Sequence, residues 1–152
     1  MREIDLTNTD KKALIDDSDF ERVNQFRWLL LKNGYVMSNS AEHLYLHRFI
    51  FGVKIKARVD HKDRNPLNNR RHNLRSATNS QNQANAAKQQ SYNNHAVTSK
   101  FKGVSWYPRH AKWRTTVAGK HVGYFNEELE AAAAYNEIAL EKFGEFALLN
   151  VF

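Results

Sequence analysis

A carboxylate and an imidazole stand next to each other at Asp60 and His61, and a side-chain amide follows at Asn82 in a predicted short helix. Carboxylate and amide oxygens are hard ligands that suit Mg²⁺ or Mn²⁺. An imidazole whose pKa lies near neutrality can accept a proton from water. These are the residue types that a hydrolytic site with one metal ion needs.

The loop between these residues is rich in Asn. Asn65-Pro66 and Asn68-Asn69 provide positions with a fixed φ or a tolerance of left-handed backbone, and Asn side chains hydrogen-bond their own backbone. We therefore expect a loop that is rigid without Gly. For a lone Asp-His pair, an ordinary polar loop would be the better interpretation.

Residues 59–82, VDHKDRNPLNNRRHNLRSATNSQN, resemble the HNH (ββα-metal) nuclease motif in its phage and intron homing-endonuclease version. The resemblance implies that Asp60 and Asn82 bind one divalent ion, Mg²⁺ or Mn²⁺. It further implies that His61 is the general base. Asn73 would be the middle residue of the motif, which braces the loop and holds the strand beside the base.

Two positions depart from the family pattern. Asn82 stands where many members carry His, so this is an H-N-N variant whose metal would have a neutral amide ligand. Arg64 stands where relatives often carry Gly, and a non-Gly residue is unfavourable there if the position requires a positive φ.

The net charge of +7 is concentrated in two blocks. Residues 22–98 contain thirteen basic and three acidic residues, and residues 100–120 contain six basic residues and no acid. Residues 1–21 and 127–145 are acidic. This distribution indicates basic faces for a phosphate backbone, and therefore double-stranded DNA as the partner. A merely soluble protein with a high pI remains compatible with the composition.

Several cations lie near the proposed metal in the sequence. Arg48 precedes the motif in a predicted helix and is suited to a phosphate, and Arg70, Arg71, His72 and Arg75 follow the loop. We expect the second group to repel one another unless DNA phosphate lies between them. The predicted DNA contacts near the nuclease site are Arg48, Arg70 and Arg75.

The composition excludes several classes of protein. There is no Cys, which rules out disulfides and Cys-ligated zinc. No apolar run is long enough for a membrane span, and the start of the chain lacks the apolar segment of a signal peptide. We expect a cytoplasmic protein with no membrane partner, in the host cytoplasm if a phage encodes it.

The remaining pattern predicts a β-rich N-terminal scaffold. Strands are expected at 3–6 and 13–16, a short helix from Phe20 to Phe26, and a hairpin over 27–37 with Trp28 in the core. Residues 86–98 are polar and short of large apolar groups, which is typical of a linker. The predicted domains are therefore 1–85 and 99–152, joined by 86–98.

Residues 99–152 predict three strands and one helix. The strands are expected at 103–107, 112–118 and 121–125, and the helix from Asn126 to Phe143. The helix is rich in Ala, which lets it lie close to the sheet. The side chains expected to face the sheet are Leu129, Ala133, Leu140 and Phe143.

This part resembles the plant ethylene-response-factor (APETALA-type) DNA-binding domain. The resemblance rests on Lys102-Gly103-Val104, Lys112-Trp113, Gly123-Tyr124-Phe125, Ala131–Tyr135 and Leu148-Leu149-Asn150. In that family the sheet lies in the major groove of DNA. The DNA contacts that the resemblance implies are Lys102, Ser105, Tyr107, Arg109, Arg114, Thr116, Lys120 and His121.

The sequence thus predicts an α+β protein with a ββα-metal HNH nuclease domain and a three-stranded antiparallel sheet packed on one helix. The predicted activity is metal-dependent, site-directed nicking of DNA by a monomer or a weak dimer on DNA. A DNA-binding regulator with a decayed nuclease motif is the main alternative. A structured-RNA binder is a weaker one, because basic faces with aromatics suit RNA as well.

Overall fold

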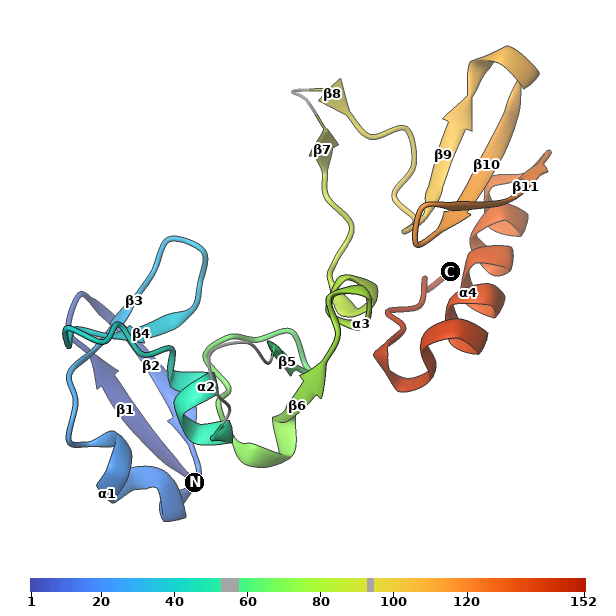
Figure 1. Cartoon of the computed structure of the whole chain (residues 1–152). Helices are drawn as coiled ribbons and strands as arrows, with labels where there is room; N and C mark the ends of the chain where they lie inside the picture. Colours follow the sequence, from blue (N-terminus) through green and yellow to red (C-terminus); the bar gives the residue numbers. More distant parts are fainter. Residues whose placement is uncertain (53–57, 93–94) are drawn as a thin grey trace. The chain divides into compact units, whose positions relative to one another are not determined.

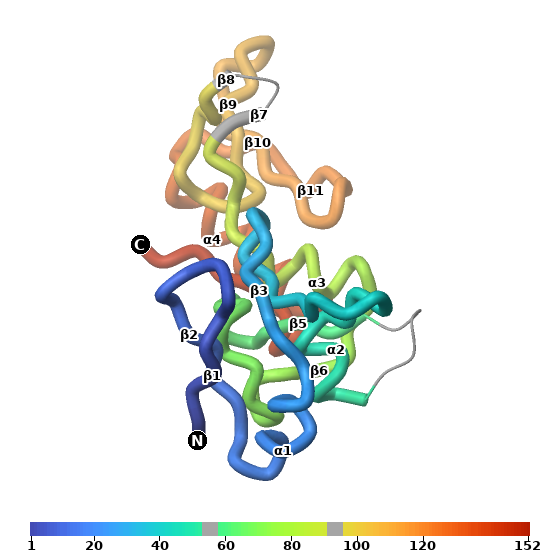
Figure 2. Tube along the Cα trace, turned by 90° about the vertical axis from the view of Figure 1, so that its left-hand side faces the viewer, coloured from blue at the N-terminus to red at the C-terminus, as the bar shows by residue number. Residues whose placement is uncertain are grey.

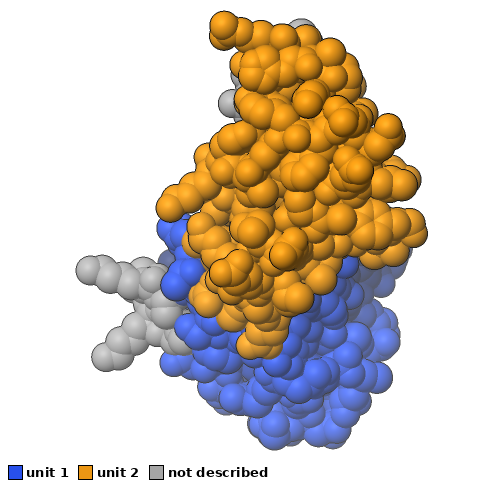
Figure 3. Space-filling model, turned by 90° about the vertical axis from the view of Figure 1, so that its right-hand side faces the viewer, with its two compact units in different colours: residues 1–79 blue, residues 80–152 orange. Residues whose placement is uncertain are grey.

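The structure is a computed structural model that describes residues 1–52, 58–92 and 95–152. Helices and several small sheets are mixed along the chain (Figure 1), so the predicted α+β class is confirmed. The chain divides into two compact units, Met1–Asn79 and Ser80–Phe152, which Figure 3 colours separately. Within the described part, no helix is long and apolar enough to cross a membrane.

A four-stranded sheet of order β2-β1-β3-β4 forms the scaffold of the first unit, and its strands are β1 (Arg2–Leu6), β2 (Thr9–Ile15), β3 (Trp28–Leu30) and β4 (Val36–Ser38). β1 pairs antiparallel with β2 and parallel with β3. Figure 2 shows β1 and β2 alongside each other. Alternate residues Ile4, Leu6, Ala13 and Ile15 are buried, as the period of a strand requires.

Three short helical segments cover this scaffold, namely η1 (Asp17–Asp19), α1 (Phe20–Val23) and α2 (Leu46–Phe51). Val23, Leu46 and Ile50 join the strand residues in one apolar core. Trp28 is 2% exposed, and its indole N–H donates to the carbonyl of Val23 at 2.9 Å. The prediction that Trp28 belongs to the core is confirmed.

A two-stranded antiparallel sheet follows, with β5 (Arg58–His61) paired to β6 (Leu74–Ala77). The segment η2 (Arg71–Asn73) precedes β6, and α3 (Asn79–Asn85) follows it. The order along the chain is therefore strand, loop, strand and helix.

The second unit contains a three-stranded antiparallel sheet of order β11-β10-β9 with a long helix packed on one face (Figure 1). Its elements are β9 (Val104–Tyr107), η3 (Pro108–His110), β10 (Lys112–Val117), β11 (Lys120–Phe125), α4 (Glu128–Phe143) and η4 (Gly144–Phe146). The strands lie close to their predicted ranges because the alternation in these segments is regular.

The buried face of α4 differs from the predicted one. Ala131, Ala132, Tyr135 and Ala139 are buried, whereas Leu129 is 57% and Leu140 is 53% exposed. Ala133 is also exposed, and Phe143 packs against the core as expected. The Thr115 hydroxyl donates to the carbonyl of Ala131 at 2.7 Å, which brings the small residues onto the sheet. Leucines on this side would hold the helix away from the strands.

Gly103 depends on the same close approach. Its φ is +74°, and a Cβ atom at this position would lie 2.1 Å from the ring of Tyr135. Only Gly combines this backbone conformation with such a short distance to a buried ring.

The region predicted as a linker contains backbone structure. Strands β7 (Ser91–Tyr92) and β8 (His95–Ala96) pair antiparallel, and residues 93 and 94 lie outside the described residues. The compact units divide between Asn79 and Ser80, ahead of the predicted boundary at 85 and 86. The difference arises because the end of α3 is hydrogen-bonded within the second unit, where the Leu148 N–H donates to the Ala84 carbonyl. The domain limits themselves stay a prediction.

A buried carboxylate, Asp19, ties η1 to η2 within the first unit. Its two oxygens accept from Arg71 at 2.8 and 2.6 Å and from Arg22 at 2.7 Å. Burial raises the pKa of Asp19, but the hydrogen bonds and charges of both arginines outweigh it, so the pKa lies below its ordinary value of 3.8. A lowered folded-state pKa stabilises the fold above the unfolded-state value, and this stabilisation is lost as the pH falls through the folded-state pKa.

We expect Asp19→Asn to lower the free energy of unfolding near neutral pH by about 1–3 kcal/mol, because both guanidinium groups lose their anionic acceptor. The difference from wild type should shrink as the pH falls below 3.8. Urea unfolding followed by circular dichroism at several pH values measures it. Asp17→Asn is the control, since the Asp17 ion pairs are exposed. A difference that stays constant at low pH would contradict the role of the Asp19 charge.

Candidate active site

Asp60 and His61 are the last two residues of β5, and the sheet register places Arg75 opposite Asp60 and Leu74 opposite His61. Asp60 is 6% and His61 4% exposed. Both side chains are therefore removed from bulk water. In such a buried environment, charges and hydrogen bonds act more strongly than at the surface.

The carboxylate of Asp60 forms a buried ion pair across the two strands. Nε and Nη2 of Arg75 both lie 2.9 Å from Oδ2 of Asp60, and the two side chains are 9% and 7% exposed. A buried carboxylate without such a partner would be strongly unfavourable. Arg75, predicted as a DNA contact, therefore balances the charge of Asp60 in this structure.

The neighbouring cations are also bound to protein groups. Arg71 forms the two-pronged pair with Asp19, and Nε of Arg70 donates to Oδ1 of Asn68 at 2.8 Å. The expectation that these cations would repel one another without DNA is wrong for Arg71 and Arg75, because each has a carboxylate partner. Sequence spacing alone did not reveal Asp19, which lies 52 residues before Arg71.

The ring of His61 is oriented by Asn69. Nε2 of His61 lies 3.2 Å from Oδ1 of Asn69, and the Asn69 amide nitrogen donates to the carbonyl of Pro66 at 3.0 Å. The bond to Pro66 fixes which end of the amide faces the ring. With the amide oxygen facing the ring, the favoured tautomer has the proton on Nε2 and the lone pair on Nδ1.

Burial lowers the pKa of His61, although the hydrogen bond to Asn69 and the charges of Asp63 and Asp60 act in the opposite direction. The neutral form, which a general base requires, is therefore favoured near neutral pH.

A second buried histidine, His47, lies on α2 with its ring centroid 5.2 Å from that of His61. Burial lowers the pKa of His47 to about 3, and the charges of His61 and Arg48 act in the same direction. His47 packs between Tyr35 and Tyr45, with ring centroids at 5.2 and 5.7 Å. These contacts are those of a neutral packing residue.

Asn73 holds the loop that follows β5. Its amide nitrogen donates to Oδ1 of Asp63 at 2.9 Å and to the carbonyl of Asn68 at 2.7 Å, while its Oδ1 accepts from the N–H of Asp63 at 3.1 Å. Asp63 also accepts from the backbone of Asn65 and from the side chain of Asn68. The loop is thus closed by side-chain amides.

Arg64 lies in this loop with a φ of 62°. The left-handed conformation that Gly would adopt without cost is therefore adopted here by Arg, and the hydrogen bonds of the loop offset the strain. The N–H of Arg64 donates to the carbonyl of His61 at 2.9 Å, so this turn directly follows the proposed base.

Asn82 is half-buried on α3 and belongs to the second unit, whereas Asp60 and His61 belong to the first. The joint binding of metal by Asp60 and Asn82 therefore stays a prediction. Among residues 1–52, 58–92 and 95–152, no group of three or more His, Cys, Asp or Glu side chains could hold a metal ion. The predicted ligand set contains one acid and one amide and is of a different kind.

The sheet face of the second unit that lies opposite α4 carries an aromatic group. Tyr124 has ring centroids at 5.4 Å from Tyr107, 4.8 Å from His110 and 4.5 Å from His121. The guanidinium of Arg114 lies 5.3 Å from the ring centroid of Tyr107. Tyr107, Arg114 and His121 were predicted as DNA contacts. Tyr124 and His110 were not, although the alternation of β11 places Tyr124 on this face opposite Arg114.

Arg114 also has an unusual hydrogen-bond state. Its Nη2 lies 3.4 Å from the hydroxyl of Ser105, while its buried Nε has no hydrogen-bond partner within the described part of the chain. A buried donor without an acceptor costs free energy.

The other predicted contacts divide into two sets. Arg109, Lys120 and His121 are exposed, and Ser105 and Thr116 are half-buried on the strands. Lys102 differs from all of these, because its ammonium is hydrogen-bonded to backbone carbonyls of the second unit.

Comparison with known proteins connects the site to a family. A family model described as HNH endonuclease matches residues 44–84, which include Asp60, His61, Asn73 and Asn82. An uncharacterised HNH endonuclease of Acanthamoeba polyphaga mimivirus is 37% identical over 138 residues, covering 84% of this chain and 68% of the relative. No solved structure gives a significant match. The comparisons give no support for an APETALA-type domain, which stays a prediction, as does a phage origin.

We expect Arg75→Met to lower the free energy of unfolding by about 3–5 kcal/mol, because it leaves the Asp60 carboxylate buried without its counter-charge. The double variant Asp60→Asn, Arg75→Met should cost much less than the sum of the two single changes. Urea unfolding of the four proteins gives the coupling. Strictly additive effects would show that the two side chains do not interact.

Proposed function

Because this chain belongs to the HNH endonuclease family, we propose that it hydrolyses phosphodiester bonds of duplex DNA, with His61 as the general base. The observation that carries the proposal is the imidazole at the end of β5, next to Asp60 in the sequence, whose pKa is lowered and whose Nε2 lies 3.2 Å from Oδ1 of Asn69. With its proton on Nε2, this ring would accept a proton from water at Nδ1, as a general base requires.

The donor atoms fit a hard cation that keeps part of its water shell. Asp60 and Asn82 would hold Mg²⁺ or Mn²⁺ through a carboxylate and an amide oxygen, and water and substrate phosphate would complete the shell. When bound, the ion would neutralise charge on the scissile phosphate and on the leaving 3′-oxygen. Because Arg75 already balances Asp60, the guanidinium and the cation compete for that carboxylate.

The protein groups have separate tasks in this proposal. Nδ1 of His61 accepts a proton from the water that attacks phosphorus in line with the leaving oxygen. Asn69 keeps the ring in the tautomer that can do so. Asn73 keeps the turn after β5 closed, so that the ring is held before substrate arrives. Positioning of this kind removes entropy from the reaction before the chemical step.

A chain with one such site cuts one strand in each encounter. The proposed product is therefore a nick, and a double-strand break would require two chains or two encounters. We propose that the chain acts as a monomer or as a weak dimer on DNA, and that its site-directed cleavage is of the homing-endonuclease kind.

We further propose that residues 99–152 bind duplex DNA through the sheet face that carries Tyr107, Arg114 and Tyr124, as the APETALA-type resemblance implies. The guanidinium of Arg114, which lies 5.3 Å from the ring centroid of Tyr107 on this face, supports this proposal. Residues 100–120 contain six basic side chains and no acid, which suits a phosphate backbone. Arg48 and Arg70 would bind phosphate near the nuclease site.

One observation favours a second candidate function. The Asp60 carboxylate is engaged by Arg75. A DNA-binding regulator that has lost cleavage would show the same feature. Incubation of supercoiled plasmid with Mg²⁺ or Mn²⁺ separates the two functions, since only the nuclease produces open-circular DNA.

We expect His61→Ala to slow plasmid nicking by about 10²–10⁴-fold while duplex binding changes little, because the base acts in the chemical step. Single-turnover nicking and fluorescence anisotropy measure the two quantities. His72→Ala is the matched control, since His72 is exposed and follows the same loop. If His61→Ala nicked as fast as wild type, the assignment of the base would be wrong.

We expect Arg114→Ala to weaken duplex binding by about 1–3 kcal/mol if Arg114 contacts a base edge. If it contacts a phosphate, the salt dependence of binding should fall by about one unit of slope. Anisotropy titrations over a salt series measure both quantities. Lys142→Ala is the control, because Lys142 is an exposed residue of α4. Unchanged affinity and slope for Arg114→Ala would remove the sheet from the proposed interface.

A further inference from the structure

One lysine donates to several carbonyls at the C-terminal end of α3. The ammonium of Lys102, which lies just before β9, donates to the carbonyls of Gln83 at 3.1 Å, Ala84 at 2.5 Å and Ala86 at 2.6 Å. A helix leaves its last carbonyls without partners in the helix, and a cation there also interacts favourably with the helix dipole. An ammonium has three donors, so Lys102 uses all of them on this helix end.

The backbone of Lys102 is itself fixed from the end of the chain. Oδ1 of Asn150 accepts from the N–H of Lys102 at 2.6 Å, and Nδ2 of Asn150 donates to its carbonyl at 3.1 Å. Asn136 on α4 binds the backbone of Asn150 in the same two-way manner, at 2.7 and 2.9 Å. A series of side-chain amide hydrogen bonds therefore connects α4 to Lys102, whose ammonium binds the end of α3.

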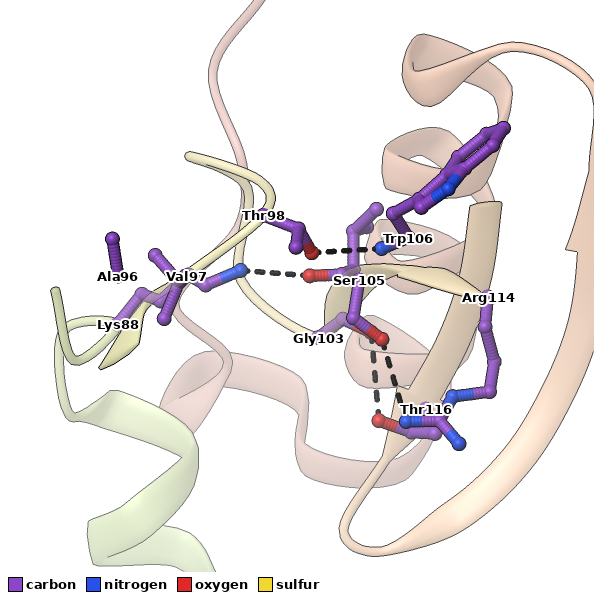
Figure 4. Close-up of a pocket in the computed structure, with 10 residues that line it drawn as sticks. Lys88, Ala96, Val97, Thr98, Gly103, Ser105, Trp106, Arg114 and Thr116 are labelled. Carbon is purple, nitrogen blue, oxygen red and sulfur yellow. Dashed lines mark hydrogen bonds between the residues drawn. The ribbon is translucent and has the colours of Figure 1, made fainter. Parts of the chain in front are cut away.

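A second lysine makes the reciprocal contact. Lys88, which follows α3, donates from its ammonium to the carbonyls of Phe101 at 2.6 Å and Val104 at 2.7 Å. Figure 4 shows the Lys88 side chain reaching toward β9. Segments 83–88 and 101–104 are thus joined by one lysine from each. Ala84 and Asn85 are buried at this junction, as expected for a packed helix end.

We propose that Lys102 is a positioning residue of the nuclease, which holds α3 on the second unit so that Asn82 is presented to the metal in a fixed orientation. The inference rests on the proposed function, because it takes Asn82 as a metal ligand. Asn82 lies directly before Gln83, the first of the three residues whose carbonyls Lys102 binds. Lys102 then supports a proposed ligand residue of its own unit.

This role differs from the one that the sequence predicts for Lys102. A lysine that binds DNA phosphate must direct its ammonium to solvent, whereas here the ammonium is directed to three backbone carbonyls. To bind phosphate, it would leave the end of α3 without its cation and these three carbonyls without their ammonium donor. The two roles therefore predict opposite results for the same variant.

The test compares full-length Lys102→Met and Lys102→Arg with Lys142→Met. The last is the control, because Lys142 is an exposed lysine on α4 of the same unit. Lys102→Met should slow single-turnover nicking or raise the Mn²⁺ concentration for half-maximal nicking by about 10–100-fold, as loss of a group that supports a metal ligand does. Duplex affinity without metal and its salt slope should stay as in wild type. Lys102→Arg, which keeps the charge and donors, should recover most of the activity.

Hydrogen exchange in the absence of metal and DNA tests the structural half of the inference. Lys102→Met should lose protection at the amides of residues 83–86, while Lys142→Met should not. Unchanged protection there would overturn the inference, as would weaker binding with a lower salt slope at an unchanged nicking rate. If wild type did not nick DNA, the proposed function would fail, and the exchange result would still decide whether Lys102 holds α3.

Discussion

The buried ion pair between Asp60 and Arg75 is the interaction on which the site depends. A carboxylate at 6% exposure pays a large desolvation cost, and the cross-strand guanidinium compensates it with two contacts at 2.9 Å. The pairing of β5 with β6 brings these side chains together, so the register of two short strands sets the charge state of the site. His61 follows directly on the same strand and shares its rigidity.

Around this pair, the protein orders a loop without Gly by using side-chain amides. Asn69 fixes the ring of His61, and Asn73 fixes the backbone of Asp63 and Asn68. The strain of Arg64 at a φ of 62° is accepted within this network. Amide groups donate and accept at once, so few residues close the loop around the carboxylate of Asp63. The site is therefore ordered before substrate binds.

The strands β1, β3, β4 and β9 to β11 and the core position of Trp28 could be predicted from the sequence, because alternation and turn residues are local signals. The strands β6, β7 and β8 were not predicted. The motif around Asp60 and His61 was visible for the same reason. The partners of Arg71 and Arg75, the buried face of α4 and the role of Lys102 were not predictable, since they depend on contacts between distant segments. Asp19 pairs with Arg71 across 52 residues, and Thr115 draws Ala131 onto the sheet. The hydrophobicity of the leucines predicted that they form the buried face of α4. Close packing of the helix on the sheet instead buries its alanines.

The most direct measurement is the fate of supercoiled plasmid incubated with the wild-type protein and Mn²⁺, compared with the same reaction in a chelator. We predict metal-dependent conversion to open-circular DNA that carries a 3′-hydroxyl at the nick. Plasmid that stays supercoiled while anisotropy shows the protein bound to DNA would contradict it, and would leave a DNA-binding protein without nuclease activity.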